Sequence, residues 1–376
     1  MTWQKILISE FGGPEVLDLT EESVVPEPGP GEVRIKVLAA GTGFTDIFIR
    51  RGRYPDYKGP VPFIPGYDLV GVVDKVGSGV TSPPPGQMVA ELCVVGGYTQ
   101  WAIRPAEFLV PVPDGVDPAQ AVCIPLAYLT AFQMLTRHHE LPSGATILVI
   151  GASGTVGTAL LDLARHFGLN AIGTCSAPNM AIVEGYGATA IDYRNHDFVD
   201  EVRKVTAERP GHRAGVDAVF DAIGGAHFAR SYACLAPGGL LVGYGSQAMA
   251  DGREGLLSAG LGLARLKLWD TFNALFKGRR AKWYSITSRR KKYPADFKAD
   301  MATLLDLLRD GAIHPVVVAR LPLSAAREVH NRMDAGGLGG KIVLTPWAPL
   351  PDDLQASVAH AAQPTFIERA RRDSNP

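Results

Sequence analysis

Apolar and polar residues alternate along short stretches in about the first hundred positions of the chain, as strands with one buried face do. Residues 31–41 (GEVRIKVLAAG) show the alternation, and residues 69–76 and 94–103 have a similar strand-like character. Glycine and proline are frequent between these stretches. Short strands separated by turn residues predict a compact β-barrel in this part of the chain.

The pattern becomes helical from Pro118 and then alternates between strands and helices. Residues 118–135 form a largely apolar helical stretch. Further along we expect strands at 190–193, 216–221, 240–243 and 341–345, and helices at 180–186, 198–208, 226–235 and 299–309. Strands that alternate with helices indicate a parallel sheet covered on both faces, which places this region in the α/β class.

Residues 145–177 contain the clearest unit of this alternation. The apolar run 147–150 predicts a strand buried on both faces, and Gly151, Gly154 and Gly157 follow it. Apolar residues then recur at helical spacing until Gly168, and residues 171–175 predict the next strand. A glycine turn between a strand and a helix lets a pyrophosphate approach the N–H groups of the helix N-terminus, so we expect a dinucleotide site here. The turn residues expected to bind it are Gly151, Ser153, Gly154, Thr155, Val156 and Gly157.

The end of the second strand indicates which dinucleotide binds. Sites for NAD usually place an Asp or Glu there to bind the ribose 2′-hydroxyl. This chain has Thr174, Cys175 and Ser176 instead, which favours a 2′-phosphate and therefore NADPH over NADH. Ser176 and, after the next predicted strand, Tyr193 and Arg194 are the candidate phosphate partners, and ordinary loop polarity is the alternative explanation for all three.

Residues 256–292 carry ten Lys or Arg residues and one acid, Asp270. Six apolar residues of this stretch fall on one helical face: Leu257, Leu261, Ala264, Leu268, Phe272 and Leu275. A basic amphipathic helix can lie on an anionic membrane surface. Alternatively, the segment is a lid or a subunit contact whose apolar face packs on its own protein. Residues 347–376 have no clear periodicity and predict a weakly ordered tail.

The overall composition is that of an ordinary globular protein, with 46% hydrophobic residues, 20% charged residues and a net charge of −1. This balance gives no reason to expect a nucleic-acid partner. The four cysteines are scattered and form no CxxC pair, so neither a cysteine-rich zinc site nor a disulfide framework is expected. The N-terminus does not read as a signal peptide, and we found no run of about 20 apolar residues that would span a membrane. We therefore expect a cytoplasmic protein.

Three groups of residues resemble one protein family. Residues 39–55 (AAGTGFTDIFIRRGRYP) and 63–80 (FIPGYDLVGVVDKVGSGV) match its catalytic part, and GASGTVGTALLDLA, IDYRNHDF and LLVGYGS match its cofactor part. The family is the medium-chain dehydrogenase/reductases, in particular their zinc-independent, zeta-crystallin-like quinone oxidoreductase branch. The resemblance covers about residues 5–346, apart from the basic stretch. It implies a GroES-like barrel over 1–124 and 300–346, a Rossmann domain with a doubly wound parallel sheet over 125–299, and a tail over 347–376.

The resemblance also implies site residues. Tyr54 matches a tyrosine beside the nicotinamide and is the candidate hydrogen-bond or proton donor, with a purely structural role as the alternative. Asp46 is the second catalytic candidate, although its match in the family holds a loop. Gly43, Phe48 and Tyr67 line the expected substrate pocket, which is roomier and less polar than in many relatives. Further cofactor contacts are implied at Thr130, Gly243, Tyr244, Gly245 and Lys341, while the lysine that binds the 2′-phosphate in relatives matches Met180.

Zinc is not expected. Zinc-dependent relatives carry Gly-His-Glu where this chain has Gly66–Tyr67–Asp68, and residues 41–43 offer no cysteine. A catalytic zinc ion needs three protein ligands and an open position. The activity implied is hydride transfer from NADPH to a quinone or an α,β-unsaturated carbonyl compound, by a homodimer whose sheet edge would be residues 240–244. Two alternatives stay open: a membrane-associated nucleotide-binding protein with little turnover, and an enoyl reductase acting in trans on a carrier-bound thioester.

Overall fold

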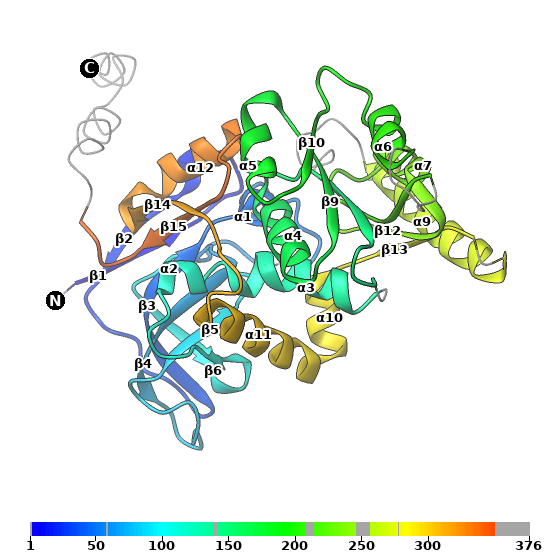
Figure 1. The fold of residues 1–376 in the computed structure, drawn as a ribbon. Helices are drawn as coiled ribbons and strands as arrows, with labels where there is room; N and C mark the ends of the chain where they lie inside the picture. Colours follow the sequence, from blue (N-terminus) through cyan, green and yellow to red (C-terminus); the bar gives the residue numbers. More distant parts are fainter. Residues whose placement is uncertain are drawn as a thin grey trace, which may run out of the picture.

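The computed structural model describes residues 2–57, 59–138, 141–207, 214–245, 256–276 and 278–349. Two large sheets dominate the molecule (Figure 1). One is built by the middle of the chain. The other is built by the N-terminal part together with strands that return near the C-terminus.

The sheet of the middle region has six strands in the order β10-β9-β8-β11-β12-β13, and every pair in it is parallel. Its strands are β8 (Thr146–Ile150), β9 (Asn170–Cys175), β10 (Thr189–Asp192), β11 (Val216–Asp221), β12 (Leu235–Gly243) and β13 (Arg280–Trp283). The parallel sheet predicted from the alternation is therefore confirmed. After β8, the chain adds β9 and β10 on one side of that strand, and it then adds β11 on the other side of β8. A crevice for ligands forms where the strand order reverses in this way, outside the carboxyl ends of β8 and β11.

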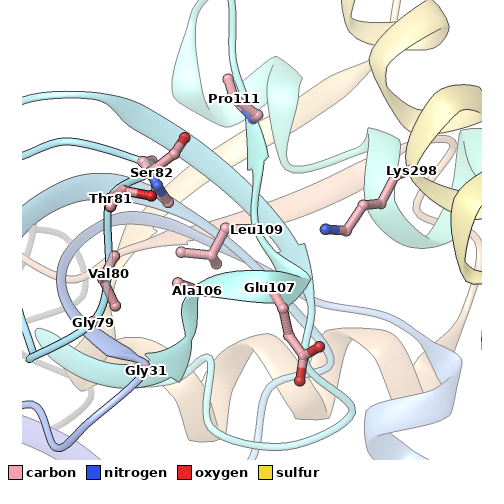
Figure 2. A pocket seen from close by; sticks show the side chains of 11 residues that line it. Gly31, Gly79, Val80, Thr81, Ser82, Ala106, Glu107, Leu109, Pro111 and Lys298 are labelled. Carbon is pink, nitrogen blue, oxygen red and sulfur yellow. The ribbon is translucent and has the colours of Figure 1, made fainter.

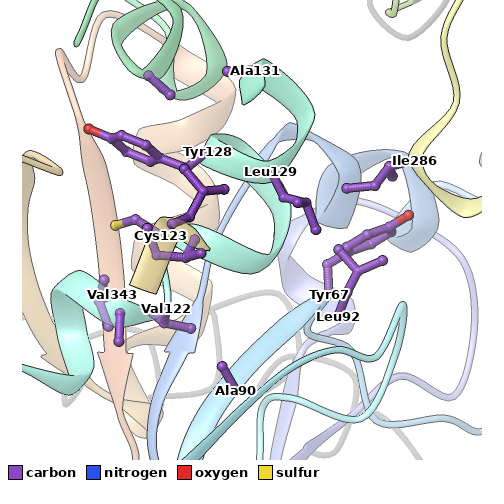
Figure 3. Close-up of a cluster of buried hydrophobic side chains, with 14 of the residues drawn as sticks. Tyr67, Ala90, Leu92, Val122, Cys123, Tyr128, Leu129, Ala131, Ile286 and Val343 are labelled. Carbon is purple, nitrogen blue, oxygen red and sulfur yellow. The ribbon is translucent and has the colours of Figure 1, made fainter. Parts of the chain in front are cut away.

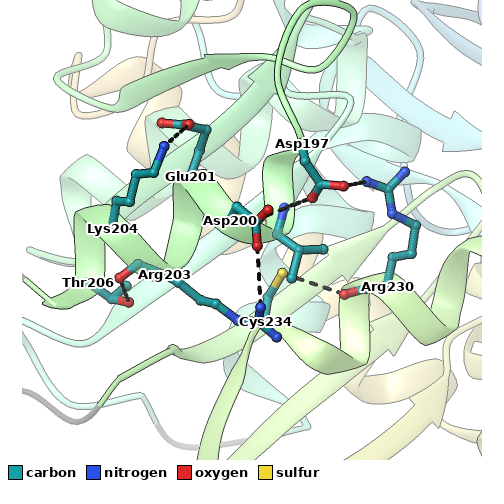
Figure 4. A network of polar contacts seen from close by, with 9 residues as sticks. Asp197, Asp200, Glu201, Arg203, Lys204, Thr206, Arg230 and Cys234 are labelled. Atoms are coloured by element: carbon teal, nitrogen blue, oxygen red, sulfur yellow. Dashed lines mark hydrogen bonds and ion pairs between the residues drawn. The ribbon is translucent and has the colours of Figure 1, made fainter.

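Helices cover both faces of this sheet. The helices are α4 (Thr155–His166), α5 (Met180–Glu184), α6 (Phe198–Ala207), α7 (His227–Ala233) and α9 (Leu256–Phe276). Ile147 and Val149 of β8 belong to the apolar cluster that includes the inner face of α4, whereas Leu148 and Ile150 belong to the cluster with α6 and α7. Successive residues of β8 thus pack into two different apolar cores, on opposite faces of the sheet, which explains the uninterrupted apolar run of this strand. On the outer surface, Arg230 of α7 pairs with Asp197 at 2.8 Å (Figure 4).

The second sheet has seven strands, ordered β14-β15-β3-β4-β5-β7, with β6 paired to β3. They are β3 (Glu32–Gly41), β4 (Asp68–Val76), β5 (Met88–Leu92), β6 (Trp101–Pro105), β7 (Val110–Pro111), β14 (Val317–Pro322) and β15 (Lys341–Thr345); β1 (Trp3–Leu7) and β2 (Asp18–Glu22) form a separate pair. The strand expected at 94–103 was placed too early, because residues 94–100 are irregular and Val94 has a φ of +70°. Since β15 pairs with β3, the end of the chain completes the N-terminal barrel.

Residues 118–136 connect the two sheets. They are divided into α2 (Pro118–Ala121), a π-helical turn (Ile124–Tyr128) and α3 (Leu129–Thr136). The stretch is long and apolar enough to cross a membrane by composition, but 78% of it is buried inside the protein, as expected of a core helix. The other helices in the described part of the chain are α1 (Phe44–Arg50), α10 (Ile286–Lys292), α11 (Pro294–Arg309) and α12 (Ala326–Ala335), with short 3₁₀ turns at Pro14–Val16, Ala106–Phe108, Ala177–Asn179 and Leu323–Ala325.

The basic stretch 256–292 differs from its prediction in two respects. It contributes β13, the outer strand of the sheet, so residues 240–244 are not the edge strand that was expected. In addition, the residues of the predicted apolar face whose side chains are described do not pack on the protein as the lid alternative requires: Leu261 is 63% and Leu268 is 59% exposed, and Leu266 is buried instead. The side chains of Leu257, Phe272 and Leu275 lie outside the described residues.

The tail begins later than predicted. Trp347 donates a hydrogen bond from Nε1 to Val37 O at 2.8 Å, and its ring meets Trp101 edge-on at 5.5 Å. Residue 347 is therefore fixed to the barrel. Residues 350–376 lie outside the described part of the chain.

Candidate active site and cofactor cleft

The glycine turn after β8 has the geometry of a phosphate-binding turn. Gly151 has a φ of +75°, which favours glycine. A Cβ on Gly157 would stand 2.4 Å from Gly151 O, so only glycine fits where α4 crosses the turn. Gly154 is the N-cap of α4, and no side chain caps this helix. Its first N–H groups therefore remain available to an anion at the crevice.

A second polar group lies where β9 ends. Asn179 is only 9% exposed, and its side-chain Nδ2 donates to Ser153 Oγ at 3.2 Å and lies 3.5 Å from Ser176 Oγ. Tyr193, which is 49% exposed, is held beside the same strand end because its N–H donates to Cys175 O. The structure thus brings Ser153, Ser176 and Tyr193 to the end of β9. Sequence reasoning missed Asn179, although its position three residues after Ser176 was a usable signal.

The other cofactor candidates lie on α3 and at the end of β12. Thr130 is 5% exposed and hydrogen-bonds the hydroxyl of Tyr284, which itself donates to Gln133 Oε1 at 2.9 Å. Gly243 and Gly245 pack tightly: added Cβ atoms would stand 2.6 Å from Phe228 Cζ and 2.3 Å from Ala222 O. Tyr244 lies between these glycines, and its N–H donates to Asp221 O at the end of the neighbouring strand β11. These contacts set the backbone at the carboxyl edge of the sheet.

Two tyrosines from different elements meet in the barrel part of the site. The hydroxyl oxygens of Tyr54, in the loop after α1, and of Tyr67, just before β4, lie 2.7 Å apart. Tyr67 is fully buried, whereas Tyr54 is partly exposed. Burial raises the pKa of both hydroxyls above the ordinary value, so both remain protonated at neutral pH. A protonated phenol can donate a hydrogen bond to a substrate oxygen on which negative charge develops.

Apolar side chains surround this pair. Phe48 of α1 is 6% exposed and meets the Tyr54 ring edge-on at 6.5 Å. Ile286 of α10 lies close to Tyr67 and Leu92 (Figure 3). Gly43 leaves room beside them, since the nearest atom to an added Cβ would be Leu126 Cδ2 at 3.7 Å. The arrangement suits an apolar substrate with one hydrogen-bonding oxygen.

Asp46 lies beneath this region on the first turn of α1. It is 1% exposed, and its Oδ2 accepts a hydrogen bond from the Gly43 N–H at 2.9 Å. Burial, together with the negative charge of Asp68, raises the pKa of Asp46 to about 8. Its visible contact caps the helix and holds the loop, and a catalytic role for Asp46 stays a prediction.

Lys341 occupies a different environment from the one expected of a cofactor contact. It is 2% exposed, and its Nζ donates to Asp68 Oδ2 at 2.8 Å and to Val122 O at 3.2 Å. This ion pair raises the pKa of Lys341, so the ammonium stays charged. A Cβ on Gly41 would stand 2.0 Å from Asp68 Oδ1, so glycine is required beside the pair. These contacts of Lys341 are structural, because they join β15 to β4 and to the helical connection.

A surface depression of about 510 Å³ lies elsewhere, between the turn at residues 79–83 of the barrel and Lys298 of α11 (Figure 2). None of the predicted site residues lines it. The tyrosine pair is the candidate active site, because two protonated hydroxyls lie there among apolar side chains, close to the helical connection that carries Thr130.

The residues at the position of a catalytic zinc do not fit that metal. The hydroxyl of Tyr67 is hydrogen-bonded to the hydroxyl of Tyr54, and Gly43 has no side chain. Within the described ranges, no cluster of three or more His, Cys, Asp or Glu residues is placed to hold a metal ion.

Comparisons with known proteins agree with this geometry. The model of the alcohol dehydrogenase GroES-like domain matches residues 29–114, and that of the zinc-binding dehydrogenases matches residues 186–344. The chain is 31% identical to 2-haloacrylate reductase from Burkholderia sp, over 91% of this chain and 98% of that one. It is 32% identical to quinone oxidoreductase from Pseudomonas aeruginosa, over 91% and 99%. The solved structure of Escherichia coli quinone oxidoreductase complexed with NADPH superposes with a TM-score of 0.79 at 26% identity, over 91% of this chain and 100% of that one.

A GroES-like barrel joined to a parallel dinucleotide-binding sheet, with these relatives, defines the class: the chain belongs to the medium-chain dehydrogenase/reductases. It is an oxidoreductase of that superfamily. Within it, the chain belongs to the zeta-crystallin-like quinone oxidoreductase branch. Both the fold class and the family predicted from the sequence are confirmed.

Proposed function

We propose that this chain is an NADPH-dependent reductase of quinones or α,β-unsaturated carbonyl compounds. The observation that carries the proposal is the Tyr54–Tyr67 hydroxyl pair. Both hydroxyls are protonated and lie among apolar side chains. The helical connection links this pair to the dinucleotide cleft. The names of the relatives, a quinone oxidoreductase and a reductase of a halogenated acrylate, support the same substrate classes.

On the cofactor side, the first turn of α4 and the glycine turn would hold the pyrophosphate. Ser176, Asn179 and Tyr193 would surround the 2′-phosphate, and no carboxylate at the end of β9 opposes it. NADPH, when bound, supplies the hydride. The preference for NADPH over NADH is therefore part of the proposal.

On the substrate side, Tyr54 would donate its hydroxyl hydrogen to the carbonyl or quinone oxygen. Tyr67 would donate in turn to the Tyr54 oxygen, which fixes the direction of the Tyr54 O–H bond and stabilises negative charge near it. Phe48 and Ile286, which are both buried, would exclude water from one side of the substrate. Solvent would then protonate the enolate carbon, since the contribution required of the protein is stabilisation of the oxyanion.

The test is cofactor oxidation with NADPH and NADH against ortho- and para-quinones, alkyl enones and an enoyl thioester. We expect turnover with NADPH on at least one class, and a loss of about 10²-fold in kcat for Tyr54→Phe because one oxyanion donor is removed. Tyr57→Phe is the matched control, since among the described residues the Tyr57 hydroxyl donates only a long hydrogen bond, of 3.4 Å, to Pro60 O. Tight NADPH binding without turnover on any class would overturn the proposal. Turnover confined to the thioester would instead select the carrier-dependent enoyl reductase.

A second proposal concerns α9, which lies at the outer end of the sheet (Figure 1). Leu261, Ala264 and Leu268 form an exposed ridge, and Arg265 and Lys267 flank it. An apolar ridge between basic side chains suits an anionic membrane surface. We infer peripheral membrane contact there, to be tested by sedimentation with anionic liposomes. Loss of binding in the Leu261→Glu/Leu268→Glu variant would support it. These substitutions are preferable to deleting residues 256–292, because that deletion would also remove β13.

Homodimerisation through the sheet edge remains a prediction, and β13 is the strand it would use. A cytoplasmic location likewise remains a prediction.

A further inference from the structure

The loop that carries Tyr54 is tied to the barrel on one side. The Tyr57 N–H donates to Tyr54 O at 3.3 Å, which closes a turn over residues 54–57. The Tyr54 hydroxyl meets Tyr67, and the Tyr57 ring packs against Phe63 with centroids 4.8 Å apart. These contacts restrain one side of the turn and leave Asp56 at its exposed tip.

The tip is tied to the other half of the molecule. Thr287 Oγ1 donates a hydrogen bond to Asp56 Oδ2, across 231 positions of sequence. Thr287 is 6% exposed and lies on the first turn of α10. The hydroxyl of Ser285, the N-cap of this helix, lies 3.0 Å from that of Thr287. Neither Asp56 nor Thr287 was singled out by the sequence.

The helix that presents Thr287 is itself firmly placed. It follows β13 after two residues, so its start is set by the cofactor-binding sheet. At its other end, Arg290 donates to Leu92 O, lies 3.7 Å from Glu91 Oε1 and covers the Phe108 ring at 4.3 Å. The Asp56–Thr287 contact is therefore one additional link between a fixed helix and a loop, and removing it leaves the anchors of α10 intact.

We propose that Asp56 and Thr287 are positioning residues that hold the Tyr54 turn against α10, and thereby keep the Tyr54 hydroxyl in its reactive position. The inference rests on the proposed function, because it assigns the pair a role in the same reaction. Asp56 lies two residues from Tyr54, so movement of the tip moves the phenol directly. Small displacements of a catalytic donor are costly, about 10²-fold in rate for about 1 Å.

The test uses Thr287→Val, which keeps the shape of the side chain and removes the donor, together with Asp56→Ala and the double variant. We expect about a 10-fold fall in kcat for each single variant, with NADPH affinity unchanged. The double variant should be no slower than Asp56→Ala alone, because Asp56→Ala already removes the contact with Thr287 as well as the direct interaction of Asp56 with the Tyr54 hydroxyl. Thr287→Ser should restore the rate, since serine keeps the hydroxyl.

The matched control is Thr303→Val on α11, where the threonine hydroxyl is exposed and bonds Ala299 O within its own helix. Amide hydrogen exchange supplies a readout that does not depend on turnover: residues 54–57 should exchange faster in Thr287→Val than in the parent protein. Unchanged exchange together with unchanged kcat, or rate losses that add in the double variant, would overturn the inference. If the parent protein reduces none of the substrates, the proposed function fails, and the exchange experiment still decides whether the link holds the turn.

Discussion

Replacement of Asp46 by asparagine should change how stability depends on pH. The carboxyl group is buried, and its Oδ2 accepts the Gly43 N–H, a contact that the asparagine carbonyl can keep. Oδ1 has no hydrogen-bond partner in the described part of the chain. Burial and the charge of Asp68 raise the pKa to about 8 in the folded protein. Asparagine imitates the protonated form that this environment favours.

The size of the effect follows from proton linkage. The pKa of an aspartate in the unfolded chain is about 4, so between about pH 4 and the folded pKa the folded state holds a proton that the unfolded state has lost. The stabilising contribution is complete below the unfolded pKa and is lost as the pH rises through the folded pKa. Each pH unit in that window costs about 1.4 kcal/mol, which amounts to about 3 to 4 kcal/mol between about pH 5 and about pH 8. Asparagine does not titrate, so the Asp46→Asn variant does not lose this stability as the pH rises.

Urea unfolding of both proteins at the two pH values measures the difference. We expect Asp46→Asn to gain stability relative to the parent by about 3 to 4 kcal/mol on going from the lower to the higher pH. Asp114→Asn, which alters an exposed carboxylate, serves as the control and should not change the slope. An unchanged slope in Asp46→Asn would refute the argument, because it would mean that Asp46 is ionised in the native protein throughout this range.

Two further predictions concern the ion pair and the cofactor. Lys341→Met should lower the free energy of unfolding by about 3 to 5 kcal/mol, because it leaves Asp68 buried and unpaired. The additional change Asp68→Asn should recover much of this loss in urea titrations. If stability is not recovered, the unpaired charge of Asp68 is not the cause of the loss. Ser176→Asp puts a carboxylate at the end of β9, where it would repel the 2′-phosphate of NADPH. We therefore expect the ratio of kcat/KM for NADPH to kcat/KM for NADH to fall about 10-fold or more. An unchanged ratio would show that the 2′-phosphate binds elsewhere.

The sequence was sufficient for most of the fold because the strands of the parallel sheet are buried on both faces and therefore read as apolar runs. It was not sufficient for β13. This strand lies at the edge, is four residues long and reads RAKW, so its charges concealed it within a basic segment. The sequence also left the orientation of α9 open, since helical periodicity identifies an apolar ridge without saying whether the ridge meets the core. Leu266 and Trp269 contact the sheet, on the opposite side from the predicted ridge.

The site was predicted as a set of residues but not as a set of contacts. Tyr54 and Tyr67 were both candidates, and nothing in their 13-residue separation indicated that their hydroxyls would meet. The glycine turn could be identified because its chemistry is local. Links such as Asp56–Thr287 depend on how two sheets pack together, and local sequence patterns carry no information about that packing.

Two glycines close together in the chain differ in how freely they can change. Gly41 faces the buried ion pair, and any side chain there would collide with Asp68 Oδ1. Gly43 has an extended backbone, with φ of −161°, and an added Cβ would meet only ordinary contacts. A side chain at position 43 can therefore be accommodated beside Leu126 without straining the barrel. In evolutionary terms, position 43 is open to variation at little cost in stability, whereas a side chain at position 41 would have to displace the buried Lys341–Asp68 ion pair.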